Sequence, residues 1–88
     1  MKTVFLKHFE KDLDKLKSLE IQNDVFETIL NVENALKLSD IKNVKKLKGY
    51  KRSYRIRIGD YRIGVFIDND VVEFAAVAHR KDIYQLFP

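Results

Sequence analysis

Apolar and polar side chains alternate most regularly along residues 53–58 and again along 61–67. A period of two is typical of half-buried β-strands. Gly59 and Asp60 separate the two runs, and a glycine in first position favours a two-residue type II′ hairpin turn. The pattern therefore predicts a β-hairpin in the middle of the chain.

The N-terminal half follows a helical period instead. Its apolar stripes predict two amphipathic helices, at 7–18 and 24–38. Asn23 or Asp24 is expected to cap the second helix, and Glu27 follows Asp24 by three residues, as in a capping box. The stripes consist of Phe9, Leu13 and Leu16 in the first helix and of Val25, Ile29, Val32 and Leu36 in the second, widened by Phe26 and Leu30.

Shorter segments complete the expected order, β-α-α-β-β-β-α. They are a strand at 3–6, a basic connection at 39–51, a turn at 68–70, a strand at 71–78 and a C-terminal helical turn at 79–87. This order is typical of the α+β class. We expect one domain, residues 1–88, in which an antiparallel sheet carries both N-terminal helices on one face.

Composition narrows the class of protein. The chain contains no cysteine, so we expect neither a disulfide nor a thiolate ligand or nucleophile. No signal-like segment opens the sequence and no apolar run approaches the length of a membrane span, so the expected location is the cytoplasm, without a membrane partner.

Positive charge is concentrated in one quarter of the sequence. Residues 42–62 contain nine lysines and arginines and one acidic residue, a net charge of +8, whereas the whole chain carries +4. Such a block is typical of proteins that bind a polyanion, although a solvated basic face or an acidic protein partner would also account for it. The side chains expected to contact the phosphates of such a polyanion are Lys45, Lys46, Lys48, Lys51 and Arg52.

The predicted hairpin also gathers its arginines. A tight turn at 59–60 places Arg57 opposite Arg62, and Arg55 opposite the bare backbone of Gly64, all on one face. Like charges set across strands repel one another, so a bound anion such as a phosphate would stabilise the cluster. The alternative is that Arg55 and Arg57 are simply the solvent face of an exposed strand.

Taken in order, several short motifs resemble the RelE/ParE superfamily of toxins from type II toxin–antitoxin modules. The motifs are Leu47-Lys48-Gly49, Tyr54-Arg55-Ile56-Arg57, Gly59-Asp60-Tyr61-Arg62 and Ala78-His79-Arg80-Lys81-Asp82-Ile83-Tyr84. The resemblance implies either a RelE-type enzyme that cleaves messenger RNA in the ribosomal A site or a ParE-type inhibitor of DNA gyrase. It also implies a cognate antitoxin that wraps the toxin in a hetero-oligomeric complex.

The resemblance further implies a metal-free reaction without a cofactor. The ribose 2′-OH attacks the adjacent phosphorus and leaves a 2′,3′-cyclic phosphate and a free 5′-OH. By this resemblance Arg62 holds the scissile phosphate, Arg55 and Arg57 fill two basic positions of the preceding strand, and Arg80 and Tyr84 match a further basic residue and a C-terminal tyrosine.

One departure from the family pattern concerns the proton. Relatives often carry lysines where this chain has Arg55 and Arg57, and an arginine cannot act as a general base in a protein. His79 and Tyr84 remain as the groups that could take the proton, with histidine better suited to transfer near neutral pH. The sequence leaves open which of the two does so.

The predicted function is thus that of a ribosome-dependent endoribonuclease toxin whose partners are mRNA, the ribosome and an antitoxin. The alternative within the family is a ParE-like toxin that inhibits DNA gyrase without cutting RNA. A third possibility is a non-catalytic nucleic-acid-binding module. Against it, the chain has no helix-turn-helix or similar reading motif.

Overall fold

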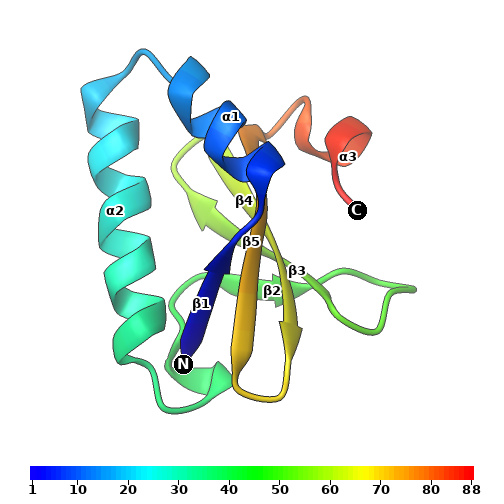
Figure 1. The fold of residues 1–88 in the computed structure, drawn as a ribbon. Helices are drawn as coiled ribbons and strands as arrows, with labels where there is room; N and C mark the ends of the chain where they lie inside the picture. Colours follow the sequence, from blue (N-terminus) through cyan, green and yellow to red (C-terminus); the bar gives the residue numbers. More distant parts are fainter.

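Five strands form one mixed sheet, with helices on both of its faces (Figure 1). The structure is a computed structural model that describes residues 1–88. The strand order across the sheet is β1-β5-β4-β3-β2. The strands are β1 (Lys2–Phe5), β2 (Val44–Lys46), β3 (Ser53–Ile58), β4 (Tyr61–Asp68) and β5 (Val71–His79).

The expected α+β class is confirmed, with two changes in the sheet. The terminal strand β1 runs parallel to β5, so the sheet is not wholly antiparallel. The segment 39–51, expected as a connection only, contains β2, which pairs antiparallel with β3. Its three residues are too few to show a clear alternation, which explains why the pattern did not predict this edge strand.

The helices begin and end at other residues than the sequence predicts. They are α1 (Lys7–Lys15), α2 (Leu19–Asn34) and the short α3 (Ile83–Leu86), with a single 3₁₀ turn at Leu38–Asp40. The cap expected at Asn23 or Asp24 is wrong. Instead Ser18 caps α2, because its hydroxyl accepts a hydrogen bond from the backbone N–H of Ile21 at 3.3 Å.

The apolar stripe of α2 is also narrower than expected. Val25 and Val32 are fully buried, but Phe26 and Leu30 are more than half exposed. Leu36 lies beyond the end of the helix and is 88% exposed, so its assignment to the stripe is wrong. Helical periodicity alone could not separate side chains that reach the sheet from those that flank it.

Two hydrophobic clusters lie on opposite faces of the sheet. The larger one joins α1 and α2 to alternate residues of β3, β4 and β5, with Phe9, Ile63 and Phe74 among its fully buried members. The smaller one joins Ile83 and Phe87 at the C-terminus to the other face of β5. The arginines of the hairpin alternate with members of the larger cluster and therefore project from the face on which α3 lies.

Asp12 fastens α1 to the central strand. Its carboxylate is buried, accepts a hydrogen bond from the backbone N–H of Val77 at 3.2 Å and lies 3.1 Å from Nδ1 of His8. A buried carboxylate requires such partners to offset its lost hydration. The contact fixes β5 relative to the first helix at the end of the sheet that carries the candidate site.

Candidate functional site

The hairpin has the predicted register and turn. Arg57 pairs with Arg62, and Arg55 pairs with Gly64. Gly59 has a φ of +61° while Asp60 keeps a negative φ, which is the combination of a type II′ turn. The three arginines therefore share one side of the sheet, here named the arginine face: the side that carries Arg55, Arg57, Arg62 and Gly64.

Backbone contacts hold two members of the site at the hairpin turn. The guanidinium of Arg62 donates hydrogen bonds to the carbonyls of Gly59 and Tyr61, both at 2.8 Å. The backbone N–H of Arg80 donates to the carbonyl of Asp60 at 2.8 Å. This last bond brings Arg80, from beyond the end of β5, to the same end of the hairpin as Arg62.

Charge accumulates around Arg62. Loss of hydration lowers the pKa of its guanidinium, and the positive charges of Arg55, Arg57 and Arg80 lower it further. Tyr84 acts in the opposite direction on the same pKa. Arg62 stays protonated at neutral pH because arginine starts from so high a pKa. The cluster is thus a concentrated positive site to which Arg55, Arg57, Arg80 and Tyr84 are all electrostatically coupled.

The backbone of Gly64 is not open to a ligand, contrary to the expectation from the sequence. A Cβ at this position would come within 2.5 Å of the Phe87 ring, so the ring lies directly over the glycine. Glycine is needed here for the close approach of the C-terminus.

Next to the arginine face is a cleft of ≈ 500 Å³, here named the basic cleft. It brings together Arg55 from β3, Tyr84 from α3 and three lysines of the segment that includes β2. Tyr84 is 60% exposed, so its hydroxyl is accessible to a ligand. The residues that line the cleft are Lys45, Lys46, Leu47, Lys48, Tyr50, Arg55, Tyr84, Phe87 and Pro88.

His79 is not among the residues that line the basic cleft. It pairs with Tyr61 across β4 and β5, and the two rings make an edge contact with their centroids 5.4 Å apart. Tyr61 packs against the larger cluster, on the side of the sheet opposite the neighbouring Arg62. Nδ1 of His79 accepts a hydrogen bond from the backbone N–H of Lys81 at 3.2 Å. Tyr84 thus lines the basic cleft with Arg55, whereas the ring of His79 lies against Tyr61.

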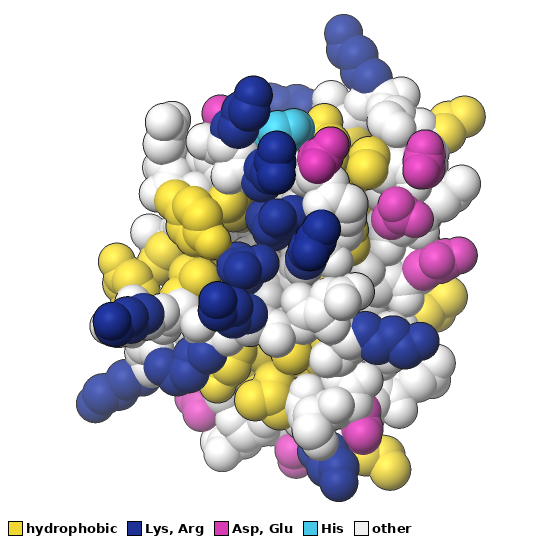
Figure 2. Space-filling model, turned by 180° about the vertical axis from the view of Figure 1, so that it is seen from behind, with side chains coloured by type: hydrophobic (Ala, Val, Ile, Leu, Met, Phe, Trp, Pro, Cys, Tyr) yellow, Lys and Arg dark blue, Asp and Glu magenta, His cyan; other side chains and the backbone are white.

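Lysines and arginines gather over this side of the molecule and run across it as a continuous band beside an apolar patch (Figure 2). Not all the predicted RNA contacts belong to the basic cleft. Lys51 is exposed outside it, and Arg52 lies over the Phe66 ring, 3.9 Å from the carboxylate of Asp68. Lys45, Lys46 and Lys48 line it.

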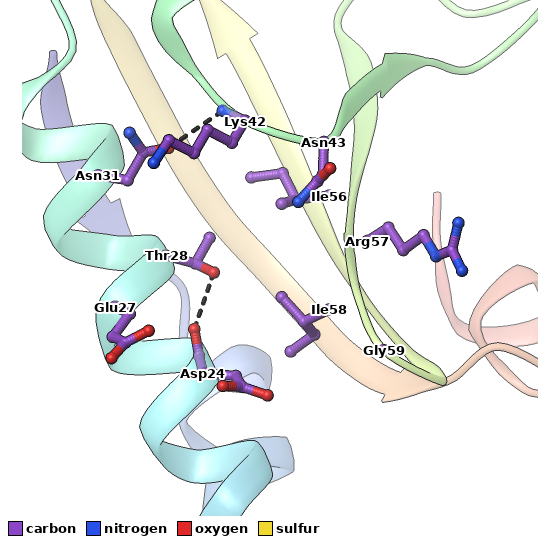
Figure 3. Close-up of a pocket in the computed structure, with 10 residues that line it drawn as sticks. All are labelled: Asp24, Glu27, Thr28, Asn31, Lys42, Asn43, Ile56, Arg57, Ile58 and Gly59. Carbon is purple, nitrogen blue, oxygen red and sulfur yellow. Dashed lines mark hydrogen bonds between the residues drawn. The ribbon is translucent and has the colours of Figure 1, made fainter.

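A second cavity, of ≈ 290 Å³, separates α2 from β3 (Figure 3). Asp24 and Glu27 give its helical wall an acidic character, and Asn31 accepts a hydrogen bond from the backbone N–H of Lys42 at 3.1 Å. Arg57 borders this groove only with its backbone, because its side chain points away from α2 (Figure 3). The cavity is therefore separate from the phosphate-binding candidates.

Sequence reasoning assigned no binding role to several residues of the basic cleft: Leu47, Tyr50, Phe87 and Pro88. A tyrosine within a run of lysines was the one available signal for Tyr50. Phe87 gave none, because its contact with Gly64 joins residues far apart in sequence.

No group of three or more His, Cys, Asp or Glu side chains is arranged to hold a metal ion. None of the helices combines the length and the apolar character that a membrane crossing requires.

Comparison with known proteins finds similarity along almost the entire chain. Residues 4–84 match the sequence model of the family described as ParE toxin of the type II toxin–antitoxin system parDE. The chain is 43% identical over 89 residues to Toxin RelE3 of Methanocaldococcus jannaschii, covering all of both proteins.

Solved structures agree with this similarity. The RelB–RelE antitoxin–toxin complex from Methanococcus jannaschii matches with a TM-score of 0.80 and 41% identity, over 97% of this chain and 99% of that one. The RelBE2 complex from Mycobacterium tuberculosis matches with a TM-score of 0.70 and 26% identity, over 90% and 96%. The intact E. coli RelBE complex shares the fold, with a TM-score of 0.69 and 20% identity over 89% and 94%.

Proposed function

Because the chain belongs to the RelE/ParE family of toxins from type II toxin–antitoxin modules, we propose that it is an endoribonuclease that cleaves messenger RNA in the ribosomal A site, in the cytoplasm. The observation that carries the proposal is the gathering of Arg55, Arg57 and Arg62 on one side of the hairpin, with Arg80 bonded to its turn. Positive charge there lowers the pKa of Arg62. A protein that acted only by binding gyrase would gain nothing from a convergent site of this kind.

The arginines supply charge stabilisation. Attack of the ribose 2′-OH on phosphorus places additional negative charge on the phosphoryl oxygens in the transition state. Arg62, held by the carbonyls of Gly59 and Tyr61, offers its remaining N–H groups as a planar fork that matches two phosphate oxygens. Arg55 and Arg57 lie beside it on the arginine face and stabilise the same charge.

We assign the handling of a proton to Tyr84. Its exposed hydroxyl lies in the basic cleft with Arg55 and couples to the charge of Arg62. In this role it gives a proton to the departing 5′-oxygen or orients the attacking 2′-OH. Arg80, held at the hairpin turn, adds positive charge on the leaving side.

The proposed partner in the cell is an antitoxin. Relatives of this chain were solved as RelB–RelE complexes, at 41% and 26% identity. A net charge of +8 in residues 42–62 favours an acidic segment of the antitoxin as the group that neutralises the arginine face. Such a segment would exclude RNA from the same surface.

Expression of the toxin without its antitoxin tests the proposal. We expect growth arrest, and primer extension should reveal cuts inside reading frames that disappear when translation is blocked.

Arg62→Ala should lower cleavage by a factor of about 100 to 1,000, since a preorganised oxyanion donor is lost. Lys11→Ala, which removes one positive charge from the exposed side of α1, is the matched control and should cleave like the wild type. Equal losses in both variants would contradict a localised site.

Inhibition of DNA gyrase is the second candidate, favoured by the ParE description of the matching family. The same induced cells distinguish it. Intact messages together with accumulated gyrase–DNA cleavage complexes would establish the gyrase function and exclude the nuclease.

A further inference from the structure

The basic cleft contains an aromatic ring that the proposed cleavage chemistry does not use. Tyr50 is 51% exposed and packs in neither hydrophobic cluster. It nevertheless lines the cleft together with Lys48 and Tyr84. A large aromatic side chain that contributes nothing to the core and faces a cleft is available to a ligand.

The backbone of Tyr50 is fixed although its ring is free. Its N–H donates to the carbonyl of Leu47 at 3.4 Å, and its own carbonyl accepts a hydrogen bond from Nζ of Lys46. Gly49 has a φ of +87°, which a type II turn requires at its third residue. Leu47 anchors this turn in the smaller cluster. The backbone that carries the ring is therefore ordered before a ligand arrives, which lowers the entropic cost of binding.

The chemistry of the cleft fits a nucleotide. Its volume of ≈ 500 Å³ lies within the range of sites for small ligands, roughly 300–1,000 Å³. Apolar side chains of Leu47, Phe87 and Pro88 border it, and lysines at its rim attract phosphates. Bases of single-stranded RNA stack on exposed aromatic rings, whereas an acidic peptide needs the cations but no planar surface.

We propose that Tyr50 is the stacking platform for an RNA base next to the scissile phosphate. This inference rests on the proposed function and names a base-binding site within it. Arg55 belongs both to the basic cleft and to the arginine face, so a nucleotide whose base lies against Tyr50 continues directly toward the phosphate over Arg62. Tyr50 is then a determinant of which message positions are cut, while Arg62 and Tyr84 act on the bond itself.

Binding of a short single-stranded RNA with 2′-O-methyl riboses tests the proposal without cleavage, because the nucleophile is blocked. Fluorescence anisotropy with the full chain should show that Tyr50→Ala weakens binding by about 10- to 100-fold. Tyr50→Phe, which keeps the ring, should retain the affinity within about twofold. An abasic residue at one position of the RNA should weaken binding to the wild type and leave binding to Tyr50→Ala unchanged.

Salt dependence separates stacking from charge. Tyr50→Ala should leave the slope of log affinity against log salt unchanged, whereas Lys48→Ala, at the rim of the cleft, should reduce that slope by about 0.7. Circular dichroism melting of each variant reports folding, and Tyr50→Ala should melt like the wild type because its ring is half exposed.

The possible outcomes distinguish this inference from the proposed function. RNA affinity unaffected by Tyr50→Ala overturns the base-binding site even if messages are still cut through Arg62. Tyr50-dependent binding of an acidic peptide, but not of RNA, assigns the cleft to a protein partner and also overturns it. Tyr50-dependent RNA binding without any message cleavage supports the base-binding site and contradicts the nuclease.

Discussion

At the scale of single residues, strand alternation gives the two candidates for proton transfer different surroundings. Tyr61 and Arg62 are neighbours in β4 and therefore project from opposite sides of the sheet. His79 pairs with Tyr61 and shares its side, while Tyr84 lines the cleft with Arg55. The sequence could not show this difference, because both residues lie in the same C-terminal segment.

The expected consequence is a large difference between two conservative variants. Tyr84→Phe removes only the hydroxyl and should lower single-turnover cleavage on programmed ribosomes by a factor of about 100 to 10,000. His79→Gln keeps a polar side chain of similar size and should cleave within about threefold of the wild type. The reverse order of effects would return the proton-transfer role to His79.

At the scale of elements, local signals were predictable and long-range contacts were not. The hairpin followed from a period of two and a Gly-Asp turn, both of which act between near neighbours. The cap of α2 was missed because Ser18 lies before the expected boundary and the stripe continues back to Ile21. The covering of Gly64 by Phe87 depends on a contact that no local pattern encodes.

The contact between Gly64 and the Phe87 ring predicts how α3 is held against the sheet. Gly64→Ala places a methyl group within 2.5 Å of the Phe87 ring, so the C-terminus must shift away from β4. We expect a loss of about 1–3 kcal/mol in the free energy of unfolding, measured by urea denaturation. Displacement of α3 should also weaken cleavage, since Tyr84 moves with it.

A double-mutant cycle provides the control for this prediction. Phe87→Ala alone should be destabilising because the ring is buried, but in the Gly64→Ala background it should cost clearly less. Additive losses would show that Gly64 and Phe87 are not coupled, and that another contact holds α3.

At the scale of the whole molecule, the arginines proposed to bind a phosphate also lower the stability of the free protein. The sheet directs its apolar residues toward α1 and α2 and its arginines toward the other side, where Arg57 and Arg62 lie directly across two strands. Such like-charged pairs destabilise a sheet. The block of positive charge at 42–62 indicated a polyanionic partner, but only the folded sheet brings Arg55, Arg57 and Arg80 close enough to lower the pKa of Arg62.

Whether the charge of Arg62 stabilises or destabilises the fold follows from the direction in which its pKa is shifted. The pKa of Arg62 is lower in the folded chain than its ordinary value, so protonation disfavours folding. The penalty is fully present while the guanidinium is protonated in both states. It begins to fall as pH rises through the folded pKa and is gone above the ordinary pKa. Near pH 7 an anion, and not a change of pH, is therefore the means of relieving it.

We expect inorganic phosphate to raise the melting temperature more than chloride does at equal ionic strength, because a multivalent anion can bridge the guanidinium groups. Arg57→Gln should stabilise the free toxin at low salt by about 0.2–1 kcal/mol and should reduce the additional benefit of phosphate. Lys11→Gln, on the exposed side of α1, should change neither quantity. Identical stabilisation of all three proteins by phosphate would show that screening alone acts, and would remove the physical basis for a phosphate site on the arginine face.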